Sequence, residues 1–381
     1  MKVALLGFGT VGRGVYEMLQ TARDLEAGPV LVRPGKDDAA YKVTEISSIT
    51  SDSAVDAVVE VLGGIEPARS WVEQALQAGK HVVTANKALV AAHGPELAAL
   101  AREKGVAFLF SAACGGGVPF LHNLTLATQS DEILSVGGIL NGTTNYMLDA
   151  MQSRGADYDD VLKDAQALGY AEADPTADVS GLDALRKIML ACAVGFEKLP
   201  CEGLYNEGIV DLTAEDVRDF QARGLTCRLV AKGGPVGDTV FAFVEPTLVK
   251  ASAPECAVKD NYNLAKYEAK CAGDIVLMGQ GAGRFPTASA VLRDLSDVLC
   301  GQRVMMPEGC VRVIADCQGC GHPYYVRLPE DLAGKLPTAE LMTSNGIARV
   351  ITKPMTVKQM HDLAAQLRAD GAKVFFAGIE E

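Results

Sequence analysis

The fold of this chain is decided by residues 2–14, which read KVALLGFGTVGRG. The apolar run 2–6 predicts a strand, and a helical pattern begins near Val15. Three glycines with the spacing G-x-G-x-x-G stand between them, namely Gly7, Gly9 and Gly12. In this spacing the first glycine allows a tight turn, the second lets backbone approach a pyrophosphate, and the third lets helix and strand pack closely. We therefore predict a dinucleotide site at the helix N-terminus, where Thr10 and Val11 follow; a glycine-rich turn without a ligand is the alternative.

Strand and helix patterns alternate through the next hundred residues. Strands are predicted at 41–46, 54–62, 81–84 and 106–110, and helices at 67–79 and 95–104. The second helix is expected to start near Pro95 and to end at Gly105. Alternation of this kind indicates a parallel sheet with right-handed crossovers, that is, a Rossmann-type domain over residues 1–138. Ligands bind at the carboxyl ends of such strands, where Gly63, Thr84 and Lys87 fall.

The sequence leaves the choice between NAD and NADP open. An acidic residue after the second strand favours NAD, and an arginine there favours NADP. The predicted second strand, 41–46, ends in Ser47-Ser48 and carries neither signal. Arg33 and Lys36 precede that strand and are candidates either for a 2′-phosphate contact or for solvated surface charge.

Composition excludes several classes of protein. The chain has 381 residues, 49% hydrophobic, and a formal net charge of -13 without a basic patch, which opposes binding to nucleic acid or an anionic membrane. No apolar run reaches the length of a membrane span, and the N-terminus lacks a signal-peptide pattern, so a cytoplasmic protein is expected. In that compartment the ten cysteines are expected to be reduced thiols.

The second half of the chain carries a set of polar motifs. A predicted strand at 133–140 runs into NGTTNYML at 141–148, a helix is predicted at 157–168, and GYAEADP follows at 169–175. Asp183 and Lys187 are four residues apart on a predicted helix, so they share one face. Together with GFGTVG at 7–12, GKHVVTANKALVAAHG at 79–94, GGGVP at 115–119 and GQGAGRFPTASAVLRDL at 279–295, these motifs resemble the homoserine dehydrogenases over roughly the first 300 residues.

The resemblance implies NAD- or NADP-dependent interconversion of L-homoserine and L-aspartate 4-semialdehyde, in threonine, methionine and isoleucine biosynthesis. It implies that Lys187 is the acid/base residue, with Asp183 as its partner and Lys87 near cofactor and substrate. An ammonium at Lys187 suits this role, because it can polarise a carbonyl oxygen and deliver a proton. The resemblance further implies substrate binding by Glu172, with Asp178, Gly142, Thr143 and Tyr170 in the same region, and cofactor contact at Gly281.

Each of these residues also has a purely structural interpretation. Asp183 follows Ser180 at the spacing of a capping box, and Asp183–Lys187 is also the spacing of an exposed helix pair. Glu172 and Asp174-Pro175 are also typical of a surface loop. Gly281 and Gly283 are also typical of a strand-to-helix turn.

The resemblance also raises the question of a monovalent cation. In the family a Glu before GGGVP helps to bind the cation, and here Ser111 stands in its place. A hydroxyl brings no negative charge, so we expect weak or absent Na⁺ dependence. Backbone carbonyls of Cys114, Gly116 and Val118 remain candidates for a weak site.

The remaining chain is divided as follows. Residues 139–283 are expected to form an α+β substrate and dimerisation domain, and helix 284–300 to return to the nucleotide domain; the resemblance implies a homodimer. Residues 301–381 contain predicted strands at 324–328, 348–352 and 374–377 and helices at 332–342 and 356–369. This order resembles an ACT-like regulatory module with one strand fewer and suggests threonine inhibition.

Cys310, Cys317, Cys320 and His322 contain a C-x-x-C pattern, which raises the question of a zinc site. Their spacing matches no standard zinc site, and free thiols are the alternative.

Two other functions remain to be distinguished. One is a different NAD(P)-dependent semialdehyde or amino-acid oxidoreductase on the same scaffold, acting on another small molecule. The other is a non-catalytic nucleotide-binding regulatory protein, which would not need Lys87, Glu172, Asp183 and Lys187 together.

Overall fold

The computed structural model describes residues 1–35 and 41–380, and it contains two compact units. Unit 1 comprises Met1–Ile133, Met189–Leu199 and Ala269–Arg312. Unit 2 comprises Leu134–Ile188, Pro200–Glu268 and Val313–Glu381. Lys36, considered above for a 2′-phosphate, lies outside the described residues.

Unit 1 is built on a six-stranded parallel sheet with the spatial order β3-β2-β1-β4-β5-β6. Its strands are β1 (Lys2–Leu6), β2 (Glu26–Leu31), β3 (Lys42–Val43), β4 (Ala57–Glu60), β5 (His81–Thr84) and β6 (Phe108–Leu109). The central strands are fully buried and rich in valine and leucine, as expected of a sheet covered on both faces. This order reverses between β1 and β4, which is the switch point where doubly wound sheets bind dinucleotides. The predicted Rossmann-type domain is therefore confirmed.

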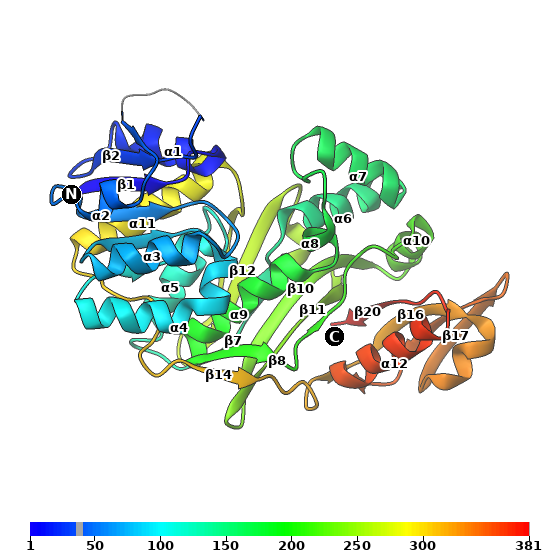
Figure 1. Ribbon diagram of the computed structural model, residues 1–381. Helices are drawn as coiled ribbons and strands as arrows, with labels where there is room; N and C mark the ends of the chain where they lie inside the picture. The colour runs from blue at the N-terminus through cyan, green and yellow to red at the C-terminus, as the bar shows by residue number, and fades with distance from the viewer. Residues whose placement is uncertain (36–40, 381) are drawn as a thin grey trace. The chain divides into compact units, whose positions relative to one another are not determined.

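Helices cover both faces of this sheet, with α3 and α4 in front of it and α11 behind it in Figure 1. The helices of unit 1 are α1 (Thr10–Leu19), α2 (Ser47–Thr50), α3 (Ala68–Gln77), α4 (Lys87–Lys104), η1 (Ser111–Ala113), α5 (Phe120–Ala127) and α11 (Arg284–Leu299). α1 packs on α11 so closely that a Cβ atom at Gly14 would lie 2.8 Å from the carbonyl oxygen of Arg284. β13 (Gly273–Gln280) precedes α11.

The second strand of this sheet is not the predicted one. β2 is the strand beside β1, whereas the predicted strand 41–46 is reduced to the two-residue edge strand β3. β2 contains Gly28 and Pro29, which ordinarily argue against a strand. The pairing with β1 shifts register at this point, and the irregularity accommodates the proline.

The predicted start of α4 is also wrong. The helix begins at Lys87, because the Asn86 side chain accepts a hydrogen bond from Leu89 N–H at 3.1 Å and caps it. Pro95 therefore lies inside the helix instead of in its first turn. Its end is as predicted, with Gly105 in the left-handed conformation (φ 66°).

Unit 2 is built on a mixed sheet that contains, in spatial order, β12-β7-β10-β11-β20-β16-β18-β17, with β9 beside β11. Its strands before residue 270 are β7 (Ile133–Ile139), β9 (Tyr205–Asn206), β10 (Leu225–Val236), β11 (Thr239–Lys250) and β12 (Tyr262–Ala269). The helices of this part of unit 2 are α6 (Gly142–Arg154), α7 (Tyr158–Ala167), α8 (Thr176–Val179), α10 (Ala214–Ala222) and η2 (Pro254–Ala257). α9 (Leu182–Phe196) begins in unit 2 and ends in unit 1. β8 (Lys198–Glu202) pairs with β14 (Val311–Ile314) in a separate two-stranded sheet. The predictions for α6, α7, α9 and β11 are confirmed. β10, the long antiparallel partner of β11, was not predicted because Arg228, Lys232 and two glycines interrupt its apolar pattern.

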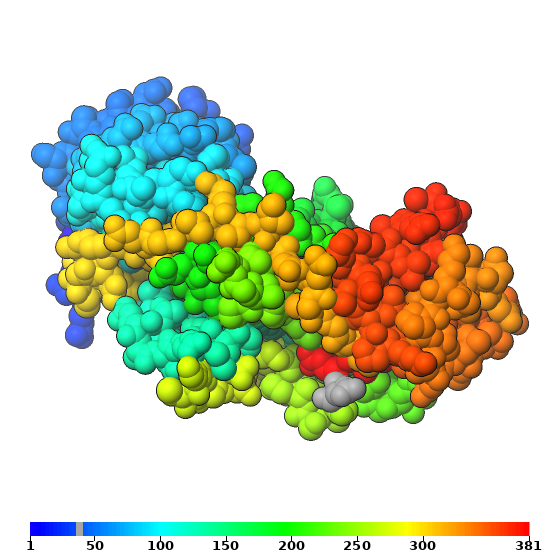
Figure 2. Space-filling view, turned by 90° about the horizontal axis from the view of Figure 1, so that it is seen from below, coloured from blue at the N-terminus to red at the C-terminus, as the bar shows by residue number. Residues whose placement is uncertain are grey.

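The C-terminal segment continues the sheet of unit 2. It contains β15 (Gly321–His322), β16 (Tyr324–Pro329), η3 (Glu330–Lys335), β17 (Thr338–Ser344), β18 (Ile347–Thr352), β19 (Met355–Thr356), α12 (Val357–Ala369) and β20 (Phe375–Ile379). The predicted helix 332–342 is wrong, since η3 and the exposed strand β17 occupy that stretch. β17 is therefore the additional strand that the sequence pattern did not predict for this segment. Tyr324, Val326, Met360 and Phe376 belong to the buried core of this segment. The surface of the segment is orange to red in Figure 2.

None of the helices in the described part of the chain is both long enough and apolar enough to cross a membrane.

Candidate active site

The glycine motif of unit 1 forms an open turn at the N-terminus of α1. Gly7 has a φ of 106°, and its N–H donates to the carbonyl oxygen of Leu31 at 3.1 Å. A Cβ atom at Gly12 would lie 2.4 Å from the Gly7 carbonyl oxygen, so only glycine allows α1 to approach β1 this closely. At Gly9, by contrast, a Cβ atom would meet nothing within 4 Å. Gly9 is also the N-cap of α1 and provides no side-chain cap.

This turn fits a dinucleotide. The space above Gly9 is open where backbone would approach a pyrophosphate, and the first-turn N–H groups of α1, beginning at Thr10 and Val11, receive no capping side chain. Such N–H groups stabilise a negatively charged phosphate, because they donate hydrogen bonds to it and carry the positive end of the helix dipole.

A buried polar network lies at the carboxyl ends of β4 and β5. The Glu60 carboxylate accepts a hydrogen bond from the Thr84 hydroxyl at 2.5 Å and from Leu62 N–H at 2.7 Å. Burial raises the pKa of Glu60 although these hydrogen bonds oppose the shift. Asn86 donates to the Gly64 carbonyl oxygen at 2.6 Å, which fixes the loop that also contains Gly63 (φ 78°). Lys87, half-buried, is the first residue of α4.

The true second strand changes which residue stands at the ribose position. β2 ends at Leu31, and the exposed Arg33 follows two residues later. Leu31 is hydrogen-bonded to Gly7, so this strand end adjoins the glycine turn. The residue near the end of β2 is thus an arginine and not an acid.

The loop 111–118 packs against the segment that precedes α11. The N–H and hydroxyl of Ser111 both donate to the carboxyl group of Asp294, which is 0% exposed. Burial raises the pKa of Asp294 to about 7, with a further contribution from the charge of Asp297 and despite the Ser111 hydrogen bonds. The backbone approaches so closely that a Cβ atom at Gly116 would lie 2.4 Å from the Gly281 carbonyl oxygen. The position predicted for a cation-binding Glu is therefore occupied by a hydroxyl that is already engaged.

Cys114 and Val118 lie in the same loop, and both are buried. Val118 N–H donates to the Gly115 carbonyl oxygen at 2.8 Å, which closes the turn between them. Within the described ranges, no group of three or more His, Cys, Asp or Glu side chains is arranged to hold a metal ion.

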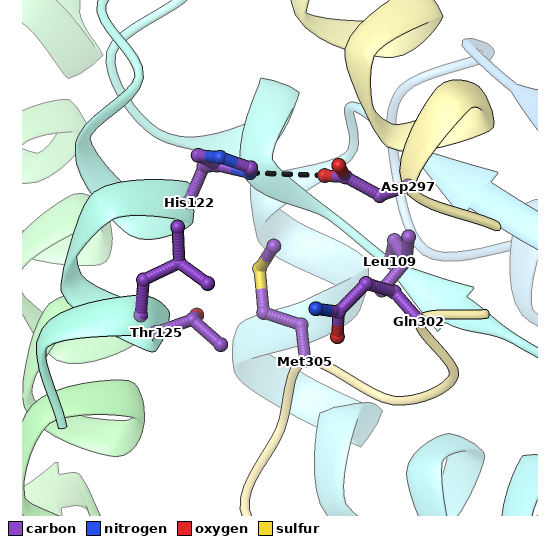
Figure 3. A pocket seen from close by; sticks show the side chains of 7 residues that line it. Leu109, His122, Thr125, Asp297, Gln302 and Met305 are labelled. Atoms are coloured by element: carbon purple, nitrogen blue, oxygen red, sulfur yellow. Dashed lines mark hydrogen bonds and ion pairs between the residues drawn. The ribbon is translucent and has the colours of Figure 1, made fainter. Parts of the chain in front are cut away.

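A small pocket in unit 1 is lined by none of the residues predicted to bind cofactor or substrate. His122 and Asp297 pair at 2.9 Å across it (Figure 3), and its other lining residues are Leu109, Thr125, Leu126, Gln302 and Met305. Its cavity volume of about 20 Å³ has room for roughly one water molecule and not for a nucleotide.

The candidate catalytic residues come together in unit 2, at the junction of β7 and α6. Lys187 and Asp183 lie on one face of α9, with 2.7 Å between Lys187 Nζ and Asp183 Oδ2. Lys187 Nζ also donates to the Leu140 carbonyl oxygen at 2.6 Å. The two residues are 8% and 6% exposed, which rules out the interpretation as an exposed helix pair. The arrangement is a buried ammonium held by a carboxylate and a carbonyl oxygen.

Asp178 and Thr143 join this cluster. The Thr143 hydroxyl lies 2.6 Å from the Tyr170 carbonyl oxygen and 3.2 Å from Asp178 Oδ2. Burial raises the pKa of Asp178, as does the charge of Asp183, while hydrogen bonds from Asn141 and Thr143 and the charge of Lys187 lower it. Tyr170 contributes its backbone, and its ring packs against Tyr146.

Two of the predicted substrate residues lie differently. Glu172 is exposed, and no hydrogen bond or ion pair reaches its carboxylate from the described residues; its backbone carbonyl oxygen accepts a hydrogen bond from Gln166. Gly142 begins α6, and a Cβ atom there would lie 2.6 Å from the Asn261 carbonyl oxygen, so packing alone requires this glycine.

The cysteines near the C-terminus serve packing. Cys317 is buried beside Phe243 and Val357, and its thiol lies 3.7 Å from the Ala242 carbonyl oxygen. Burial raises the pKa of Cys317 to about 11 and that of Cys320 to about 12, so both are neutral thiols at neutral pH. His322 pairs with Glu245 instead, at 2.6 Å.

Sequence reasoning missed Asn141, Glu60 and Asp294. Asn141 had a readable signal, because an asparagine between a strand and a helix is a typical N-cap. Glu60 lies inside an apolar run, whereas Asp294 has charged and polar neighbours in the sequence, and the burial of neither could be predicted.

Two family models match the chain: one described as homoserine dehydrogenase over residues 119–296, and one described as the NAD-binding domain of homoserine dehydrogenase over residues 7–111. A homoserine dehydrogenase of Corynebacterium glutamicum is 44% identical over 315 residues, which is 77% of this chain and 70% of that protein. The crystal structure of a homoserine dehydrogenase from Thiobacillus denitrificans matches 100% of this chain and 98% of its own at 32% identity, with a TM-score of 0.90. A hyperthermophilic archaeal homoserine dehydrogenase in complex with NADPH matches 79% of this chain and 98% of its own at 25% identity, with a TM-score of 0.67.

Proposed function

This chain belongs to the homoserine dehydrogenase family, and on that premise we propose that Lys187 and Asp183 carry out its proton transfer. The activity of the chain is the NAD(P)-dependent interconversion of L-homoserine and L-aspartate 4-semialdehyde. The observation that carries the proposal is the buried Lys187–Asp183 pair, whose ammonium is also held by the Leu140 carbonyl oxygen.

Proton transfer at Lys187 follows from its chemistry. When bound, the nicotinamide supplies a hydride to the aldehyde carbon, or accepts one from the alcohol carbon. In the reductive direction the Lys187 ammonium hydrogen-bonds to the aldehyde oxygen and gives it a proton as negative charge develops there. In the oxidative direction the neutral amine takes the hydroxyl proton. Asp183 holds Nζ in place and stabilises the ammonium form.

Substrate binding is assigned to the neighbouring polar groups. We propose that Asp178, with Thr143 and the backbone of Gly142 and Tyr170, contacts the amino-acid end of the substrate. Asn141 links Asp178 to Asp183, and Thr143 hydrogen-bonds to Asp178 and to the Tyr170 carbonyl oxygen. Glu172 keeps a proposed role at the α-ammonium, supported by the family motif and by its exposed carboxylate.

The dinucleotide is assigned to the open turn of unit 1. Gly7, Gly9, Thr10, Val11 and Gly12 would hold the pyrophosphate, with Gly63, Thr84, Lys87 and Gly281 contributing around it. The uncapped N-terminus of α1 and the open space at Gly9 support this assignment.

We propose that NADP is the preferred cofactor. Arg33 follows the strand next to the glycine turn, in the place where an acidic residue would select NAD. An arginine there pairs with a 2′-phosphate, whereas a ribose 2′-hydroxyl gains little from it.

Oxidation of L-homoserine, followed by the absorbance of the reduced cofactor, tests both the activity and the preference. We expect turnover with L-homoserine above that with other amino-acid alcohols, and a lower KM for NADP⁺ than for NAD⁺. Arg33→Ala should raise the KM for NADP⁺ by about tenfold or more, with little effect on NAD⁺, since one charge-assisted pair is worth roughly 1.5–3 kcal/mol.

Arg23→Ala is the matched control, because Arg23 is exposed near the opposite end of β2. No turnover with L-homoserine would exclude the function. An Arg33→Ala variant with an unchanged NADP⁺/NAD⁺ ratio would exclude the proposed cofactor contact alone.

Three further assignments complete the proposal. Residues 1–138 with 284–300 form the nucleotide domain, 139–283 the substrate and dimerisation domain, and 301–381 an ACT-like module, supported by the four-stranded segment β20-β16-β18-β17 with α12. The family resemblance supports a cytoplasmic homodimer and inhibition by threonine. The engaged Ser111 supports weak dependence on a monovalent cation.

A further inference from the structure

We propose that Asn141 is a positioning residue that clamps Asp178 and Asp183 together and thereby fixes Lys187 for proton transfer. The proposal rests on the function assigned to Lys187 above. It gives a role to Asn141, which neither the catalytic nor the substrate assignment above includes.

Capping of α6 fixes the orientation of the Asn141 amide. Its Oδ1 atom accepts a hydrogen bond from Thr144 N–H at 2.8 Å and lies 3.0 Å from the Thr144 hydroxyl. The amide nitrogen must therefore face the other way. Turning the amide over would break the cap and place its oxygen against two carboxylates.

Both hydrogens of that nitrogen are used on carboxylates. Asn141 Nδ2 lies 2.7 Å from Asp178 Oδ1 and 2.8 Å from Asp183 Oδ2. Two carboxylates this near each other disfavour each other's ionisation, and a donor between them offsets that repulsion. One neutral side chain thus bridges the acid of α9 and the acid of α8.

Leu140 and Asn141 together position the Lys187 ammonium, Leu140 directly and Asn141 through Asp183. Asp183 Oδ2 accepts from both Asn141 and Lys187, and the carbonyl oxygen of Leu140, the residue before Asn141, accepts from Lys187. Rotation of Asp183 away from Asn141 would also carry away the oxygen that orients Lys187 Nζ. The strand-to-helix junction therefore sets the position of the ammonium through one side chain and one backbone oxygen.

A purely structural role for Asn141, as a helix cap, makes a different prediction. Asparagine, aspartate and serine are about equal as N-caps. Asn141→Asp and Asn141→Ser therefore keep the cap. In Asn141→Asp, an oxygen of a third carboxyl group stands where the amide nitrogen donated to Asp178 and Asp183. In Asn141→Ser, that nitrogen is absent.

The experiment measures kcat and KM for reduction of L-aspartate 4-semialdehyde against pH for both variants, together with their thermal midpoints; in this direction Lys187 reacts as the ammonium, so the acid limb reports the carboxylates. We expect a kcat per folded protein lowered by about tenfold to a hundredfold, the loss that follows from a missing hydrogen bond to a charged group. The thermal midpoint should fall more for Asn141→Asp than for Asn141→Ser, because Asn141→Asp places a third acid beside the half-buried Asp178 and the buried Asp183. The acid limb of the kcat profile should move to higher pH, because carboxylates that lose a donor take up a proton more readily. Asn141→Asp should show the larger shift.

Thr356→Ser is the matched control, since Thr356 caps α12 through Gln359 N–H and contacts neither catalytic carboxylate. It should leave kcat and the acid limb unchanged. If either folded Asn141 variant kept the wild-type kcat and acid limb, or lost only thermal stability, Asn141 would be a cap and nothing more. Lys187→Ala separates the two proposals, because its inactivity alongside active Asn141 variants would defeat this inference and leave the proposed function standing.

Discussion

At the residue scale, the central feature is that Lys187 and Asp183 are charged yet nearly buried. Burial of an ion pair rarely stabilises a fold, because the desolvation of both charges opposes their attraction. Retaining the pair in a packed helix therefore points to a chemical use. The Leu140 carbonyl oxygen and the Asn141 amide supply the hydrogen bonds that make its burial tolerable.

Asp294 gives a pH-dependent prediction. Its carboxyl group has a folded-state pKa of about 7, raised by burial above the ordinary value of 3.8. A raised pKa means that the folded form keeps a proton that the unfolded chain releases, so this contribution to stability is complete below about pH 4 and is lost as the pH rises to about 7. The loss is about 1.4 kcal/mol per pH unit in that window, and on the order of 4 kcal/mol in total.

Asp294→Asn should remove this slope, because an amide can still pair with Ser111 without titrating. Urea unfolding at several pH values between 4 and 8 measures it, with Glu103→Gln, an exposed acid 67% accessible at its side chain, as the control. Equal slopes in the wild type and the Asp294→Asn variant would contradict the assigned protonation of this residue.

At the scale of elements, the two glycines at the start of α1 are expected to differ in what they do. Gly12 is required by packing, since its Cβ atom would lie 2.4 Å from the Gly7 carbonyl oxygen, whereas the surroundings of Gly9 are open. Gly12→Ala should therefore lower the free energy of unfolding by roughly 1–3 kcal/mol. Gly9→Ala should cost less than about 1 kcal/mol and yet raise the KM for the cofactor about tenfold or more, because its methyl group occupies the space of the pyrophosphate.

Denaturant unfolding without cofactor and cofactor KM values distinguish the pair. A Gly9→Ala variant with wild-type cofactor KM would place the pyrophosphate elsewhere.

Elements with a regular pattern could be predicted, and those depending on partners could not. The strand at 81–84 and the helices α6 and α9 follow from apolar periodicity and flanking turn residues. β2 was not predicted, because Gly28 and Pro29 ordinarily argue against a strand; here a register shift in the pairing with β1 accommodates them. β17 was not predicted, because its exposed residues resemble the solvent face of a helix and because its pairing with β18 depends on tertiary structure.

The same holds for the site. Lys187 and Asp183 were predictable from helix spacing and motif, but the amide bridge from Asn141 depends on how α8, α9 and the β7–α6 junction meet. Arg33 gained its significance only once β2 was located.

At the scale of the whole molecule, the two units are assigned different parts of one reaction. Unit 1 is assigned the dinucleotide and with it the hydride, while unit 2 is assigned the proton through Lys187. A defect in Arg33 or Gly9 should therefore appear in the KM for the cofactor, and a defect in Asn141 or Lys187 in kcat.

Proton transfer by Lys187 is the central step of the proposed reaction, and the turnover of Lys187→Ala with and without added primary amines tests it most directly. We predict a kcat per folded protein lowered by roughly 10²–10⁴, with partial recovery that rises with amine concentration, while Lys163→Ala, an exposed lysine on α7, stays at the wild-type value. A Lys187→Ala variant that turns over L-homoserine at close to the wild-type rate would contradict it.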